Sequence, residues 1–369
     1  MFGVMLLFAV TLMQGYVFWR AASVPSIRRR ISRKKLAGLG IVLWALFLLG
    51  RVFGREDAGA ITTTLEIFGM TWMAMLFLTS VALFAVEVAT GFGFFLARFR
   101  PGLRGAALAA GCALSAVALF QGLRAPVVQN YDVYLNGLPG ELDGTVIIAL
   151  SDLHLGSVLG ERWLAARVEQ VREERPDVIV LLGDVFEGHG TPGKELLAAL
   201  RRLPAPQGIW AVLGNHEFHG SNSDNTALFK EAGIHVLRNA WVELRPGLVL
   251  AGVDDLTNNH AASDAGTSLA KALAGRPPGA TVLLSHVPLP LTASADKGVD
   301  LILSGHTHAG QIWPFGYLVR QRFPLFEGVY ELGGMTTIVS RGTGTWGPRM
   351  RLWRPAEISR VTLHQAKAN

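Results

Sequence analysis

The sequence contains few charged residues and almost no cysteine. Of its 369 residues, 17% are Asp, Glu, Lys or Arg, whereas 50% are hydrophobic. This balance is apolar for a soluble enzyme. Cys112 is the one cysteine and lies within an apolar run, so no disulfide can form within the chain. The cysteine content therefore leaves the redox compartment open.

Acidic residues are scarce only in the first third of the chain. Residues 1–125 carry 13 Lys and Arg against 4 Asp and Glu, whereas residues 126–369 carry 21 against 24. The formal net charge of +6 therefore comes from the first third, and the remainder is slightly acidic. This distribution excludes a basic nucleic-acid face on the larger part of the chain, and we expect no nucleic-acid partner.

Long apolar runs dominate residues 1–123 and predict a bundle of about four transmembrane helices. The third run is best explained by one span over about Phe68–Val86 with an interfacial tail. The basic cluster follows the first run, so we do not expect a cleaved signal peptide. The four runs are residues 1–19, Leu36–Phe53, Ile61–Ala97 and Gly105–Leu123.

The basic residues between these runs predict the orientation of the chain. Seven Arg and Lys residues lie between the first and second runs, from Arg20 to Lys35, and Arg98, Arg100 and Arg104 lie between the third and fourth. Cytoplasmic loops are enriched in Lys and Arg, which places both termini outside. We therefore expect a multi-pass cell-membrane protein whose C-terminal domain is extracytoplasmic. If the third run held two short spans instead of one, the C-terminal domain would lie on the cytoplasmic side.

Two carboxylates fall within the third apolar run. Glu66 and Glu87 are candidates for intramembrane charges, although a position at the membrane interface is the favoured interpretation. The Arg-rich first loop suits a topology signal, and binding of anionic lipid is the alternative.

The sequence changes character after residue 123. Residues 124–143 predict a linker rich in Pro and Gly, and residues 144–369 alternate strand-like runs with amphipathic helices. This alternation predicts stacked β layers covered by helices. The clearest helices are Arg162–Glu174, Lys194–Arg202 and Asn225–Ala232, and later strands are expected at Leu248–Val253, Thr281–His286, Asp300–Ser304, Thr336–Ser340 and Ile358–Leu363.

Polar side chains follow five of the apolar strand-like runs. The run Val178–Leu182 leads to Asp184, and the edge where strands end is where α/β sheets bind ligands. One such residue alone would be explained as a turn or a helix cap. The other strand ends lead to Asp152 and His154, to Asn215, His216 and Glu217, to His286, and to His306 and His308.

These residues have the composition of a metal cluster. Residues i and i+2 of an extended strand point the same way, so Asp152 and His154 can reach one metal ion, and His306 and His308 have the same spacing. Asp184 can bridge two cations through its two oxygens. Nitrogen and oxygen ligands without thiolate suit Mn, Fe or Zn, and a two-metal site of this kind holds a phosphoryl group and activates water.

The ordered blocks D-x-H, G-D-x-x-E, G-N-H-E, a single H and G-H-x-H resemble the calcineurin-like metallophosphoesterase superfamily. The resemblance covers residue 144 to the C-terminus and implies a four-layer αββα sandwich with two divalent metal ions. It assigns Asp184 to both metals, His216 to the leaving oxygen, and Glu217 to a role in orienting its neighbours. The remaining ligands would be Asp152, His154 and His308 for the first metal, and Asn215, His286 and His306 for the second.

Two further stretches narrow the resemblance. Ala309-Gly310-Gln311 and the tail Ser340–Gly347 resemble a membrane-anchored branch that includes enzymes similar to UDP-diacylglucosamine pyrophosphatases. Glycines in this tail could approach a phosphate or form tight turns, and Arg341 could pair with a phosphate or with a carboxylate.

Three histidines and a pair of aspartates stay outside the metal-ligand pattern. His189, His219 and His260 lie in polar loops and are expected at the surface. The pair Asp254-Asp255 ends another strand and could face the site, although a turn is the favoured interpretation.

Together these observations predict a membrane-anchored phosphoesterase with two metal ions, acting on a phosphomonoester, phosphodiester or pyrophosphate. The substrate would be a phosphorylated small molecule or a lipid-linked envelope compound, with membrane lipid as a partner. The alternative is a metal-binding membrane scaffold or sensor that has lost turnover. Metal identity, substrate and oligomeric state do not follow from the sequence.

Overall fold

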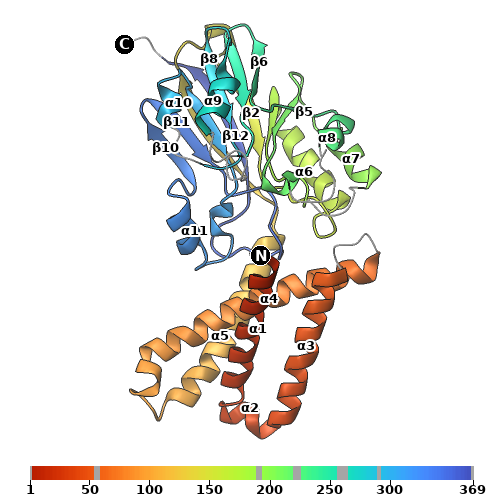
Figure 1. The fold of residues 1–369 in the computed structure, drawn as a ribbon, viewed down its shortest axis with the longest axis vertical. Helices are drawn as coiled ribbons and strands as arrows, with labels where there is room; N and C mark the ends of the chain where they lie inside the picture. Colours follow the sequence, from red (N-terminus) through yellow and green to blue (C-terminus); the bar gives the residue numbers. More distant parts are fainter. Residues whose placement is uncertain are drawn as a thin grey trace. The chain divides into compact units, whose positions relative to one another are not determined.

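The structure is a computed structural model that describes residues 2–53, 59–187, 193–218, 226–255, 265–288 and 292–366. The chain divides into two compact units (Figure 1). The first comprises Met1–Leu123 together with Gly347–Leu352, and the second comprises Arg124–Trp346 together with Trp353–Asn369.

The first unit is helical, and four of its helices are long and apolar enough to cross a membrane. The third apolar run forms one continuous helix of 30 residues, about 45 Å at 1.5 Å per residue. A single helix supports one tilted span and not two short ones. The helices are α1 (Phe2–Ala21), α2 (Pro25–Arg30), α3 (Arg33–Phe53), α4 (Ala60–Ala89) and α5 (Arg100–Leu123).

Small residues bring the helices of this unit close together. At Gly111 in α5, a Cβ atom would lie 2.6 Å from the Cα atom of Thr79 in α4, so a larger residue would push the two helices apart. Close approach at glycine is a common basis of helix packing in membranes, where dispersion contacts and not the hydrophobic effect drive association.

A buried carboxylate joins three helices of the first unit. Glu87 of α4 is 2% exposed, and its oxygens accept hydrogen bonds from Arg104 of α5 at 2.8 and 3.2 Å. Arg20 of α1 lies 3.3 Å from the same carboxylate, and Arg104 also donates to Ser23. Glu87 is therefore part of an ion pair buried between helices, near the C-terminal ends of α1 and α4 and the start of α5.

We expect the Glu87→Gln variant to lose about 3–5 kcal/mol of stability, because removing one partner leaves a buried charge uncompensated. Thermal unfolding in detergent would measure this loss. A double-mutant cycle with Arg104→Gln isolates the pair, because the double variant should be less destabilised than the sum of the single ones. Additive losses would contradict the pairing.

A short segment from near the C-terminus belongs to the first unit. In Gly347–Leu352, the backbone N–H of Arg351 donates to the carbonyl of Ala118 in α5 at 2.9 Å. Gly122 allows this contact, since a Cβ there would lie 2.6 Å from the Cα of Met350. Arg351 is 1% exposed. Nothing in the local sequence pattern predicts this placement.

The second unit contains two six-stranded sheets. The first has the order β1-β12-β2-β3-β4-β5 and the second β10-β11-β9-β8-β7-β6. In the first sheet β2 to β5 are parallel and β12 is antiparallel to β2. In the second, β7, β8, β9 and β11 are parallel, and β6 and β10 are antiparallel edges. These arrangements gather the carboxyl ends of the parallel strands of each sheet at one edge.

The elements of the second unit begin and end as follows. The strands are β1 (Val127–Leu135), β2 (Thr145–Leu150), β3 (Val178–Leu182), β4 (Ile209–Val212), β5 (His235–Val236), β6 (Ala240–Arg245), β7 (Leu248–Gly252), β8 (Ala280–Leu284), β9 (Leu301–Ser304), β10 (Gly328–Leu332), β11 (Met335–Val339) and β12 (Glu357–Gln365). The helices are α6 (Glu161–Glu173), α7 (Lys194–Leu200), α8 (Thr226–Glu231), α9 (Ala265–Leu273), α10 (Thr292–Ala295) and α11 (Gly316–Arg322).

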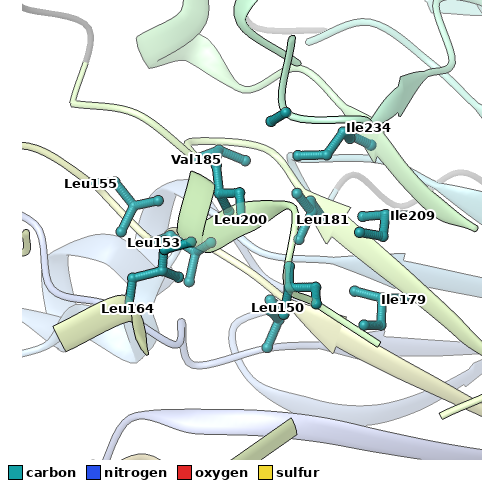
Figure 2. Packing of buried hydrophobic residues seen from close by; sticks show 14 of the residues in the cluster. Leu150, Leu153, Leu155, Leu164, Ile179, Leu181, Val185, Leu200, Ile209 and Ile234 are labelled. Atoms are coloured by element: carbon teal, nitrogen blue, oxygen red, sulfur yellow. The ribbon is translucent and has the colours of Figure 1, made fainter. Parts of the chain in front are cut away.

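Three apolar layers hold the second unit together. In β3, Ile179 and Leu181 belong to one apolar cluster with side chains of α6, α7 and α8, and Figure 2 shows them with Leu164 of α6 and Leu200 of α7. Val178, Val180 and Leu182 pack between the two sheets. Both faces of β3 are covered, which explains why its sequence is continuously apolar. A third cluster joins the far face of the second sheet to α9, and the expected four-layer αββα sandwich is confirmed.

The stretch expected to be a linker, residues 124–143, contributes an edge strand. Within it, β1 pairs in parallel with β12 over nine residues, from Val127 opposite Glu357 to Leu135 opposite Gln365. Most of β1 is exposed or half-buried, so its sequence lacks the apolar signal of the central strands. Three residues, Arg124–Pro126, remain between α5 and β1.

Candidate metal centre

The candidate ligands lie just beyond the ends of five strands. Asp184 follows β3 after one glycine, and the other residues follow β2, β4, β8 and β9. Three overlapping groups have ligand atoms within 4.8 Å of one another. The groups are Asp152 with His154 and His308, His154 with Asp184 and His216, and Asp184 with His286 and His306.

Several of the candidate ligands have a strained backbone conformation. Asp152, His154, Asp184, His306 and His308 all have positive φ angles, between 46° and 70°. Such conformations cost of order 1 kcal/mol or more for a residue with a Cβ. The expectation that the i and i+2 residues lie on an extended strand is therefore wrong, because β2 and β9 end before them. Left-handed turns bring each pair together instead.

The first group is compact. His154 Nε2 lies 3.0 Å from His308 Nε2, and His308 Nε2 lies 3.5 Å from an oxygen of Asp152. Two imidazole nitrogens at this separation with a carboxylate alongside form a concave set of donors for one cation. On the outer side, Glu187 lies 3.0 Å from His154 Nδ1 and fixes the ring orientation, as carboxylates do for ligand histidines.

Asp184 links the group that contains His154 and His216 to the group that contains His286 and His306. Its Oδ2 lies 3.4 Å from His286 Nε2 and 3.9 Å from His154 Nε2. His286 Nε2 is also 3.2 Å from His306 Nδ1 and 3.3 Å from the side-chain oxygen of Asn215. One carboxylate oxygen therefore lies between the two histidine sets, where a bridging ligand is required.

The orientation of His286 follows from its other ring nitrogen. Nδ1 lies 2.7 Å from the carbonyl of Leu182, so Nδ1 carries the proton and Nε2 is the ligand atom in the neutral ring. The same logic applies to His216, whose Nδ1 lies 3.0 Å from the carbonyl of Glu187. Its Nε2 therefore accepts in the neutral ring and donates in the imidazolium.

Glu217 acts through the backbone of the site loops. Its carboxylate accepts four N–H groups, from Asp184 at 2.9 Å, Val185 at 2.8 Å, Phe186 at 3.1 Å and Gly214 at 2.7 Å. This arrangement clamps the loop after β3 to the loop after β4. The orienting role inferred from the resemblance therefore has a definite geometry: Glu217 is a positioning residue for Asp184.

Charges inside the site shift its pKa values strongly. Burial alone lowers the pKa of a histidine, and at His306 it prevails and lowers the pKa to about 4. At His154 burial is outweighed by Glu187, Asp184 and Asp152, which raise the pKa to about 9. At His286 it is outweighed by Asp184 and other carboxylates, and the pKa rises to about 10.

The two central carboxylates are shifted in opposite directions. Burial raises the pKa of Asp184, but His286, His216 and His154 outweigh it and hold the pKa well below its ordinary value. Burial and then the charge of Asp184 raise the pKa of Glu217 to about 7. Asp184 therefore stays ionised as the common negative charge between the two histidine sets.

The donor set fits divalent cations. Buried imidazoles, carboxylates and an amide oxygen converge without a thiolate, which is the ligand chemistry of Mn, Fe or Zn. The carboxylates that hold protons on His154 and His286 would stabilise cations at the same positions. Metal binding requires neutral imidazoles and would displace those protons.

Two residues given little weight in the sequence contribute to the site. Ser151 Oγ donates to the carboxylate of Asp152, which also accepts the backbone N–H of His306 at 3.0 Å. Asp255 is 1% exposed and raises the pKa of His286. The sequence left open whether the pair Asp254-Asp255 faces the site, and the burial of Asp255 near His286 favours that alternative for Asp255. A serine after a strand carries no signal of its own, so only the fold could identify Ser151.

Contacts in the structure distinguish between the alternatives that the sequence left open for Arg341, Asp254 and the glycines of the tail. Arg341 pairs with buried Glu357 at 2.6 Å, and Asp254 pairs with Arg238. Gly344 packs on the ligand loop, since its N–H donates to the carbonyl of Asp152 at 3.1 Å and a Cβ there would meet the same oxygen. The positions of His189, His219 and His260 lie outside the described residues.

The chain is similar to known proteins over this region. Residues 145–310 match the calcineurin-like phosphoesterase family. An uncharacterized metallophosphoesterase of Aquifex aeolicus is 37% identical over 243 residues, covering 64% of this chain and 91% of that protein. A transmembrane protein with metallophosphoesterase domain from Bos taurus is 35% identical, covering 69% of this chain and 60% of that protein.

A further relative shows similar coverage. An uncharacterized metallophosphoesterase of Helicobacter pylori is 33% identical, covering 66% of this chain and 65% of that protein. The match thus spans less than two thirds of the length of several relatives, including the bovine one.

Proposed function

The chain belongs to the calcineurin-like phosphoesterase family, and from this premise we propose that it is a membrane-anchored, metal-dependent hydrolase of phosphoester or pyrophosphate bonds. The observation that supports the proposal most strongly is the position of Asp184. Its Oδ2 lies between His286 and His154, which belong to two histidine sets. A shared carboxylate between two ligand sets is the arrangement that two-metal hydrolysis requires.

In this proposal Asp152, His154, Asp184 and His308 would hold one cation, and Asp184, Asn215, His286 and His306 the other. Divalent ions, when bound, would neutralise the charge of the phosphate oxygens and lower the pKa of the attacking water. We take Mn, Fe or Zn as the class of metal. The protein itself orients these ligands through Glu187 at His154 and through the Leu182 carbonyl at His286.

His216 would stabilise or protonate the leaving oxygen. The carbonyl of Glu187 fixes the proton on Nδ1, so the ring can donate a second proton only from Nε2. The backbone N–H of His216 donates to Asp184 Oδ1 at 2.8 Å, which ties the position of this ring to the shared carboxylate. A proton donor at this place matters most when the leaving group is a poor one.

We expect His216→Asn to reduce kcat by about 10²-fold for an alkyl phosphoester, because proton donation in the transition state contributes about that much. The loss should be much smaller for a p-nitrophenyl ester, whose leaving group needs no proton. Steady-state kinetics on both esters would measure the difference. His364→Asn, a change at a half-buried position near the end of β12 and outside the metal centre, serves as the matched control, and equal losses on both esters would contradict the role.

A catalytically silent metal-binding scaffold or sensor is the second candidate function. The two are separated by treating the purified full chain with a chelator and then adding Mn²⁺. For a hydrolase we expect complete loss of activity on a chromogenic phosphodiester and recovery on adding metal. Metal uptake without turnover on monoester, diester or pyrophosphate substrates would favour the scaffold.

The substrate we propose is lipid-linked or belongs to the cell envelope, because the chain carries helices long enough to span a membrane. The resemblance of the tail Ser340–Gly347 to enzymes similar to UDP-diacylglucosamine pyrophosphatases makes a lipid-linked pyrophosphate one such compound. Testing hydrolysis of a pyrophosphate-linked lipid against its soluble head group in detergent would distinguish this class from small phosphoesters.

We further propose that the second unit is extracytoplasmic. The basic residues between α1 and α3, and those between α4 and α5, support a cytoplasmic side for both loops. A reporter that functions only outside the cytoplasm should therefore be active when it is fused after Asn369. Activity of a cytoplasm-specific reporter would overturn this orientation.

A further inference from the structure

The segment that follows the last metal-ligand block carries apolar side chains on its outside. Trp313 is 43% exposed, Phe315 41%, Tyr317 66% and Leu318 60%. Helix α11 lies within this segment, and none of its seven residues is buried. Figure 1 labels α11 in the second unit, apart from the two sheets. Clustered exposed side chains of this size indicate a binding surface.

Arginines border these side chains, and acidic residues are missing among them. The sequence from Trp313 to Phe326 contains Arg320 and Arg322 but no Asp or Glu. Both arginines are exposed, with the guanidinium of Arg320 4.8 Å from the centre of the Phe326 ring and that of Arg322 5.4 Å from the Phe323 ring. The surface is therefore apolar and aromatic with a basic edge.

This surface is built on the metal site. Gly310 is the last residue of the 3₁₀ turn that begins at His308, and it contacts Gly316 at the start of α11. At the other end of α11 the Phe323 ring packs edge-on against the ring of His306 at 4.8 Å. One end of the helix thus packs on the turn that carries His308 and the other on the ring of His306, so the segment is anchored beside the candidate ligands.

We propose that Trp313–Arg322 is a membrane-docking surface that binds the interface of a bilayer containing anionic lipid. Trp and Tyr favour the level of the lipid head groups, apolar side chains beside them enter the boundary of the acyl chains, and arginines are attracted to anionic head groups. A membrane is available to this surface because four helices of the same chain are long enough to span one. Only three residues connect α5, the last of these helices, to β1 of the second unit.

The docking surface also implies a class of substrate. A metal site anchored beside a surface that binds the head-group layer suits phosphoesters carried by amphiphiles, whose phosphate would reach the metal ligands while the apolar tail stays in the lipid. This consequence rests on the proposed function. The docking itself does not, because it can be measured without turnover.

The experiment uses the full chain in lipid nanodiscs that contain anionic lipid. In a Cys112→Ser background, Leu318→Cys is labelled with an environment-sensitive fluorophore, and lipids carrying a quencher are introduced. The control is Tyr134→Cys on β1, an equally exposed position at 65%. We expect the label at position 318 to emit as in an apolar environment and to be quenched by the lipids, whereas the label at position 134 is not.

Equal quenching at both positions, or a label at position 318 that emits as in water, would overturn the proposal. So would an apolar emission that lipid quenchers leave unchanged, because it would identify a second copy of the chain as the occupant. In the labelled protein, Arg320→Gln and Arg322→Gln should each weaken docking roughly fivefold with anionic lipid and have little effect with neutral lipid. Loss of hydrolysis with intact docking would count against the proposed function alone.

Discussion

Replacing Asp184 by Asn is expected to lower phosphoester hydrolysis by at least about 10³-fold while leaving the fold intact. The change keeps the shape of the side chain and removes the charge of the carboxylate whose oxygen lies 3.4 Å from His286 and 3.9 Å from His154. In other hydrolytic sites, preorganised groups that stabilise the charge of the transition state contribute a rate factor of about this size. Initial rates on a chromogenic phosphodiester, together with circular dichroism, would measure both parts.

The matched control for this variant is Asp132→Asn. Asp132 lies on the edge strand β1, and its side chain is 67% exposed beside His364. The same chemical change there should leave the rate within about twofold, because exposed ion pairs contribute little. Hydrolysis by the Asp184→Asn protein at the unaltered rate would remove the shared carboxylate from the mechanism.

The second large effect is expected from Glu217→Gln. Each oxygen of the buried carboxylate accepts two backbone N–H groups, with Asp184 and Gly214 on one and Val185 and Phe186 on the other. An amide can accept on one side only, so its NH₂ group would face two buried donors. Each unmet buried group costs about 1–3 kcal/mol, which predicts a loss of about 2–5 kcal/mol.

The consequence for activity should appear as weaker metal binding. Glu217 holds the loop that carries Asp184, so its loss misplaces the shared ligand, and we expect a raised metal requirement that high Mn²⁺ partly restores. Chemical unfolding and activity against Mn²⁺ concentration would measure the two effects. Glu243→Gln is the control, because that exposed carboxylate accepts the N–H of Gly247 at 3.3 Å. Equal stability losses in both proteins would contradict the clamp.

The sequence predicts which residues form the site better than it predicts how they are arranged. Each ligand block is local, with an apolar strand followed by Asp, Asn or His, and the order of five blocks carries the resemblance. The left-handed backbone of Asp152 and His154 is invisible in the sequence, because it occurs at residues other than glycine. The fold imposes that conformation through long-range contacts such as those between Gly344 and the Asp152 carbonyl.

The fold shows the same division. Strands such as β3 can be predicted from the sequence, because both of their faces are covered and their residues are therefore continuously apolar. The edge strand β1 does not, since its side chains are mostly exposed and its residues resemble a linker. The buried Glu87 with Arg104 was likewise hidden, because an ion pair 17 residues apart depends on how two helices pack and not on local pattern.

The most direct test of the account is a crystal structure of the Mn²⁺-loaded full chain with anomalous scattering. We predict two anomalous peaks about 3.5–4 Å apart, one on each side of the Asp184 carboxylate. The first should lie among Asp152, His154 and His308, and the second among Asn215, His286 and His306. A single peak, or metal bound away from Asp184, would contradict the two-metal centre on which the proposed function rests.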